Sequence, residues 1–74
     1  MYRDIAKEIA KKLIEYDNTN NENYLPLLNR FIDEYNINKT DDRNKIIMEV
    51  VQELSHLNYE IISTHPFKIK NIYD

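Results

Sequence analysis

The sequence predicts a mainly α-helical domain, in which three helices are followed by a C-terminal β-hairpin. Two observations lead to this fold class. Apolar residues recur at helical spacing in three successive segments, and after Leu57 the spacing changes to an alternation of apolar and polar residues. Residues 1–74 are expected to form one small domain, because this length is near the lower limit for a single apolar core. The 42% of hydrophobic and 31% of charged residues are typical of a globular protein.

The first helix is expected over residues 2–17. Its apolar residues cover about half of the helix circumference. They are Tyr2, Ile5, Ala6, Ile9, Ala10, Leu13, Ile14 and Tyr16. The turn-forming side chains of residues 17–21 then compete with helical hydrogen bonds by bonding to the nearby backbone. The first helix is therefore expected to end there.

The second helix is expected over residues 23–36. Pro26 falls in its first turn, where the missing N–H breaks no intrahelical hydrogen bond. The apolar face consists of Tyr24, Leu27, Leu28, Phe31, Ile32 and Tyr35. The Asn-rich stretch 36–39 ends the helix, since Asn favours turns.

The third helix is expected over residues 41–57. Thr40 is a good N-cap, and Asp41 and Asp42 suit the positive end of the helix dipole. The buried stripe is expected to consist of Ile46, Ile47, Val50, Val51, Leu54 and Leu57, with Met48 on another side. The centres of the apolar stripes predict a core of Leu28, Phe31, Ile47, Val50, Val51 and Leu54.

The hairpin is expected over residues 59–73. Asn58 can take the left-handed position that ends a helix and that Gly usually fills. The segments 59–64 and 67–72 are rich in β-branched and aromatic residues, and Phe67 and Ile69 alternate with lysines. The His65-Pro66 pair between them predicts the turn.

The run Leu54-Ser55-His56-Leu57-Asn58-Tyr59-Glu60-Ile61, followed by a hairpin, resembles the C-terminal half of winged helix-turn-helix domains. In that family a recognition helix ends in a Leu-x-x-Leu-Gly-Tyr-like signature, and two strands form the wing. The match covers about residues 40–73. Two features depart from the family pattern, because Asn58 replaces the usual Gly and no strand is evident between the first two helices. A three-helix bundle with a tail hairpin is the alternative.

The resemblance implies that residues 41–56 face a DNA major groove, and that phosphate contacts come from this helix and the wing. The corresponding basic residues are Arg43, Lys45, Lys68 and Lys70. The charge pattern opposes this role, since the net charge is −3 and nonspecific affinity for nucleic acid comes from basic residues. We expect the solvent face of the third helix to be net negative, with Asp41, Asp42, Glu49 and Glu53 against Arg43 and Lys45.

The composition excludes several chemistries. The chain has no Cys and no Gly, so it has no disulfide, no thiolate site and no glycine-rich phosphate loop. Ser55 and His56 are helix neighbours that point about 100° apart, so they do not form a nucleophile and base pair. We interpret Glu49, Glu53 and His56 as a solvated acidic face. We therefore expect no catalytic residue, no cofactor, no metal site and no small-molecule substrate, and the protein is predicted not to be an enzyme.

The wide apolar arcs of the helices favour a docking role, because a small domain can cover only part of them with its own chain. The predicted docking residues are Tyr2, Ile9, Leu13, Tyr16, Tyr24 and Tyr35. We expect a partner protein or a second copy of the chain. We also expect a cytoplasmic location, since no apolar run is long enough to span a membrane. The sequence favours a small non-catalytic docking regulator or inhibitor, encoded by a phage or mobile element and acting on a host protein. The alternative is a winged-helix DNA-binding transcription regulator.

Overall fold

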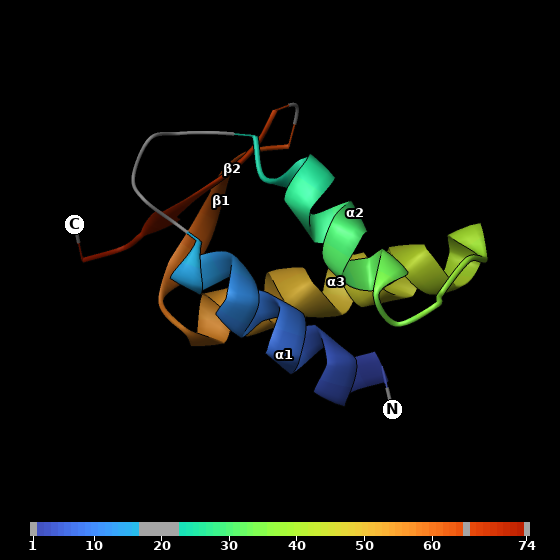
Figure 1. Cartoon of the computed structure of the whole chain (residues 1–74). Coiled ribbons are helices and arrows are strands. Elements are labelled where there is room, and N and C mark those ends of the chain that lie inside the picture. The colour runs from blue at the N-terminus through green and yellow to red at the C-terminus, as the bar shows by residue number, and fades with distance from the viewer. Residues whose placement is uncertain (1, 17–22, 65, 74) are drawn as a thin grey trace.

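The computed structural model describes residues 2–16, 23–64 and 66–73, and these form three helices and a two-stranded antiparallel sheet (Figure 1). The elements are α1 (Tyr2–Glu15), α2 (Leu25–Asp33), α3 (Thr40–His56), β1 (Tyr59–Thr64) and β2 (Phe67–Asn71). The predicted fold class is confirmed. The hairpin buries Phe67 and Ile69 in the core, so it is part of the domain and not a tail on a helical bundle.

Helices α1 and α3 lie side by side and start at the same end of the molecule (Figure 1). α1 ends at Glu15, and Tyr16 lies in a turn. The expected range 2–17 runs two residues further, and Asp17 and the turn formers after it lie outside the described residues.

Helix α2 is shorter than the predicted range 23–36. Asn23 lies before the helix, where its Oδ1 accepts a hydrogen bond from the N–H of Leu25 at 3.1 Å. After Asp33 the chain forms a turn, in which Asn36 has a φ of 59°. Asn tolerates this left-handed conformation better than other non-glycine residues, so the Asn-rich stretch ends the helix as expected, but three residues earlier.

Helix α3 begins one residue earlier than predicted. The N-cap is Lys39, whose backbone is extended and whose side chain makes no capping bond, so the prediction of Thr40 as N-cap is wrong. The N–H of Arg43 donates to the Lys39 carbonyl at 3.0 Å, and the Arg43 side chain holds the carbonyl of Ile37. These bonds fix the entry of the chain into the helix. At the other end Asn58 has a φ of 68°, which confirms its predicted left-handed position.

The two strands pair antiparallel, with Tyr59 opposite Asn71 and Thr64 opposite Phe67. A β-bulge between Ile61 and Ser63 leaves Ile62 as an extra residue in β1. The predicted pairing of 59–64 with the segment after Pro66 is confirmed, although β2 ends at Asn71 and not at Tyr73. The strand ends there because the chain turns after Asn71, whose side-chain oxygen accepts a hydrogen bond from the Tyr73 N–H at 2.9 Å.

The hairpin turn lies beside the start of α2 (Figure 1). The N–H of Tyr24 donates to the Phe67 carbonyl at 2.8 Å, and the N–H of Phe67 donates to Asn23 Oδ1 at 3.0 Å. The segment 23–24 is not a strand, but its bonds to β2 give the backbone order 23–24, β2, β1. The start of β2 is therefore held to the segment that leads into α2.

Four of the six predicted core residues, Leu28, Phe31, Val50 and Leu54, are buried. Ile47 and Val51 are only half-buried, and Ile46 is buried instead, so the core line of α3 runs through Ile46, Val50 and Leu54. Leu57 is exposed at the end of the helix, against expectation, whereas Met48 is exposed as expected. Residues one position apart point about 100° apart on a helix, so α1 and the hairpin can cover only one of the two neighbouring lines.

Candidate functional site

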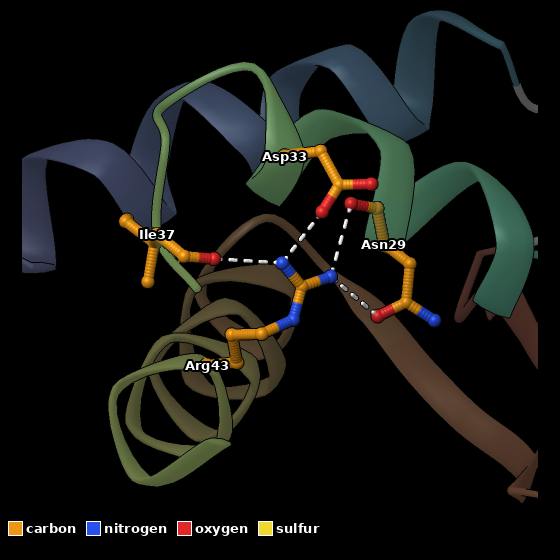
Figure 2. Close-up of polar contacts among 4 residues, drawn as sticks. All are labelled: Asn29, Asp33, Ile37 and Arg43. Carbon is orange, nitrogen blue, oxygen red and sulfur yellow. Dashed lines mark hydrogen bonds and ion pairs between the residues drawn. The ribbon is translucent and has the colours of Figure 1, made fainter. Parts of the chain in front are cut away.

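Arg43 does not lie free on the surface of α3. Its Nη1 donates to Asp33 Oδ1 at 2.6 Å and to the Ile37 carbonyl at 2.8 Å, and its Nη2 donates to the carbonyl and Oδ1 of Asn29 at 3.2 and 3.0 Å (Figure 2). These four bonds engage both terminal nitrogens of the guanidinium. Arg43 therefore joins α2, the connection after it and α3, and it is not available as the phosphate contact that the resemblance implied.

The other three predicted nucleic-acid contacts divide between two elements. Lys45 is exposed on α3, whereas Lys68 is half-buried and Lys70 exposed on β2. The strand register sets Lys70 opposite Glu60 and Lys68 opposite Ser63. Within the described part of the chain none of the three lysines forms an ion pair. The structure thus brings together only the two lysines of the hairpin.

The exposed face of α3 is less acidic than predicted. Asp42 and Glu49 are half-buried on the flank of the helix, and Glu53 is only 8% exposed. The exposed residues beyond the first position of the helix are Asp41, Asn44, Lys45, Met48, Gln52, Ser55 and His56. With one acid and one base, this face is close to neutral, and Met48, 65% exposed, lies near its centre.

Two of the acidic residues instead contact neighbouring side chains. The hydroxyl of Tyr2 hydrogen-bonds to the carboxylate of Asp42, which raises the pKa of Tyr2 above its ordinary value, with a further contribution from desolvation. Glu53 Oε2 lies 3.9 Å from Nδ1 of His56. The first contact connects the N-terminal ends of α1 and α3.

The predicted docking residues are mostly used within the domain. Ile9, Leu13 and Tyr24 are buried in the core, so they pack within the domain and are not accessible to a partner. Tyr2 and Tyr35 are half-buried, and Tyr16 is exposed. The six residues therefore do not form one docking surface.

The side chain of Lys12 lies over two aromatic rings of α2 and the turn after it. Its Nζ lies 5.4 Å from the ring centre of Phe31 and 5.6 Å from that of Tyr35, and it also pairs with Glu34 at 3.3 Å. The Tyr16 ring packs on Phe31 with a centroid distance of 5.8 Å. These contacts cover part of the apolar surplus that the sequence predicted for the first two helices.

Exposed apolar side chains gather instead at the C-terminal hairpin. Of the large hydrophobic residues that are exposed in the described part of the chain, two lie elsewhere, Tyr16 and Met48. The other four lie in the hairpin or at its base and are named here the hairpin patch: Ile62 in β1, and Leu57, Ile72 and Tyr73 just outside the strands. The sequence indicated that one of the neighbours Ile61 and Ile62 would be exposed, because successive residues of a strand point to opposite faces.

The described residues contain no group of three or more His, Asp or Glu side chains arranged to hold a metal ion. None of the helices found in the described ranges is long and apolar enough to cross a membrane. Comparisons with protein-family models, curated proteins and solved structures found no match to this chain.

Proposed function

We propose that this domain is a non-catalytic protein-docking regulator or inhibitor that binds its partner through the hairpin patch. The observation that carries the proposal is the concentration of exposed apolar side chains there, with Ile62 48% and Tyr73 77% exposed. Exposed apolar surface on a soluble protein, where it is extended, often marks the place where a partner binds. Tyr is moreover among the residues that most often dominate binding energy in interfaces.

Two structural features support a preformed docking surface. The hairpin is held to the body by the bonds of Phe67 to the segment 23–24, and its base is closed by a 2.9 Å bond from the Ile72 N–H to the Asn58 carbonyl. Its inner face is anchored by the buried Phe67 and Ile69. A rigid surface loses little conformational entropy on binding, so even a small patch can give useful affinity.

The partner is proposed to be a host protein, in the setting of a small cytoplasmic regulator from a phage or mobile element. The bias toward Ile, Asn, Lys and Tyr, which AT-rich codons produce, fits such a source. A second copy of the chain is the other protein that could cover the patch. Sedimentation over a range of concentrations distinguishes the two, because a self-associating domain gains mass as its concentration rises.

The test is capture of a partner from the native host with three purified proteins, with and without nuclease. They are the parent, the double variant Ile62→Ser/Tyr73→Ala, and Met48→Ser as a matched control on α3. We expect the parent and the control to retain the same protein after nuclease treatment, and the double variant to lose it by about thirtyfold or more, as for an interface hot spot. Retention by the double variant, or loss of all captured protein with nuclease, contradicts the proposal.

A DNA-binding transcription regulator is the second candidate, and the neutral face of α3 favours it. Asn44 and Gln52 are exposed there, and side-chain amides are the groups that read adenine in a major groove. The backbone order 23–24, β2, β1 also fits a winged-helix-like topology. Against this candidate, Arg43 is occupied within the fold, and only Lys45, Lys68 and Lys70 remain of the predicted phosphate contacts. A duplex-binding titration at two salt concentrations tests it.

A further inference from the structure

The outward face of the hairpin is shaped by the bulge in β1. Phe67 and Ile69 point into the core, so Lys68 and Lys70 lie on the opposite, outward face. The bulge sets both Ile62 and Ser63 opposite Lys68. An exposed apolar side chain is thereby held next to Lys68, and Lys70 lies two residues further along the same face of β2.

The hairpin differs in charge from the rest of the chain. Glu60, Lys68 and Lys70 give residues 59–73 a formal charge of +1, whereas the whole chain carries −3, so the remaining residues carry −4. Glu60 lies opposite Lys70 and offsets part of its charge, but Lys68 faces the uncharged Ser63. The outward face is thus slightly basic on an acidic domain, and this charge difference favours acidic partners there.

We propose that this outward face binds an acidic segment of the partner protein, with an apolar side chain of that segment on Ile62 and carboxylates beside Lys68 and Lys70. This inference rests on the proposed docking function. The two lysines would attract the carboxylates of the segment, and the exposed Ile62 would contact its apolar side chain. A phosphate backbone would satisfy the lysines but would leave Ile62 against charged oxygens with no gain from burial.

The segment is expected to lie across the face and not to add a strand at an edge. The bulge at Ile62 interrupts the regular ladder that an added strand needs along β1. On β2 the Phe67 carbonyl already accepts the N–H of Tyr24. Side-chain contacts of the outward face therefore determine specificity.

The test is an NMR titration of the labelled domain with defined probes. The first probe is a peptide in which a single central Leu is flanked on both sides by Glu. Its matched controls carry Ser in place of Leu, or Lys in place of each Glu, and a short DNA duplex serves as the phosphate probe. We expect the acidic Leu peptide to shift the backbone amides of Ile62, Ser63, Lys68 and Lys70, and both control peptides and the duplex to shift them much less.

Two variants that preserve the fold make the result specific. Lys68→Gln/Lys70→Gln is expected to weaken binding of the acidic peptide by about fivefold or more, whereas Lys7→Gln/Lys11→Gln, the same change on the exposed side of α1, leaves it unchanged. Equal weakening by both variants, shifts confined to other surfaces, or tighter binding of the duplex overturns the inference. If the captured partner still depends on Ile62 and Tyr73 while the peptide fails to bind, this inference falls and the docking function stands.

Discussion

Arg43 Nη1 lies 2.6 Å from Asp33 Oδ1, and this contact connects the first turn of α3 to the last turn of α2 (Figure 2). The same guanidinium also donates hydrogen bonds to the backbone carbonyls of Ile37 and Asn29. The residue is therefore a polar bridge that fixes how the two helices follow each other. Its planar fork matches this set of acceptors in a way that a lysine ammonium cannot.

Replacement of Arg43 is expected to destabilise the fold. Arg43→Ala leaves two backbone carbonyls and Asn29 without their donor, which costs about 1–3 kcal/mol, and Arg43→Lys recovers only part of that loss. Lys45→Ala, an exposed position on the same helix, is the control, with a change within about 0.5 kcal/mol. The measurement is chemical denaturation followed by circular dichroism. An Arg43→Ala variant as stable as Lys45→Ala would show that the bridge contributes nothing.

The core line of α3 can be tested with two neighbouring residues of the same type. Ile46 is fully buried and Ile47 half-buried, so Ile46→Ala is expected to cost about 2–4 kcal/mol and Ile47→Ala clearly less. Thermal unfolding of the two variants compares them directly. Equal losses would mean that the helix is rotated from the orientation described here.

This pair also marks what the sequence alone could predict. The existence and order of the helices follow from hydrophobic periodicity, and the hairpin follows from the change of period after Leu57. The doublets Ile46-Ile47 and Val50-Val51 fit two adjacent lines equally well, so periodicity cannot choose between them. The choice depends on how α1 and the hairpin pack, which involves residues far away in the sequence. Arg43 was misjudged for the same reason, because its partners lie up to 14 residues away.

The left-handed backbone at Asn58 gives a further prediction. Because φ there is 68°, Asn58→Ala should cost about 1 kcal/mol, whereas Asn58→Gly should be neutral or slightly stabilising. Asn36, with a φ of 59°, should respond in the same order. Denaturation midpoints of the four variants provide the measurement. If Ala and Gly were equivalent at position 58, the helix could not end in this conformation.

The contact between Tyr2 and Asp42 predicts a dependence on alkaline pH. The hydrogen bond to Asp42 raises the folded-state pKa of Tyr2 above the ordinary value of 10.0. The contribution to stability is therefore complete below pH 10.0 and is lost as pH rises through the folded-state pKa. In a spectrophotometric tyrosine titration, Tyr2→Phe should remove a group that titrates above 10.0. Loss of a group that titrates at or below that value would contradict the contact.

The two candidate functions differ most clearly in how binding responds to salt. DNA binding through phosphates loses affinity log-linearly with salt, with a slope of about −0.9 for each phosphate contact. Docking through apolar side chains depends much less on salt. The informative variant is Lys45→Ala/Lys68→Ala/Lys70→Ala, which omits Arg43 because its loss would disturb the fold.

The measurement is a duplex-binding titration on genomic fragments from the source operon at two salt concentrations. The docking function predicts weak binding of every fragment near physiological salt, because the chain carries a net charge of −3 and Arg43 is occupied. The DNA function predicts that the triple variant loses duplex binding at moderate salt. The slope of log affinity against log salt concentration should become less negative by up to about 2.7, which corresponds to three lost phosphate contacts. Submicromolar binding of one fragment by the parent, lost in the triple variant but kept in Lys7→Gln/Lys11→Gln, would contradict docking as the main function. It would instead identify the neutral face of α3, with Asn44 and Gln52, as the surface that reads the bases.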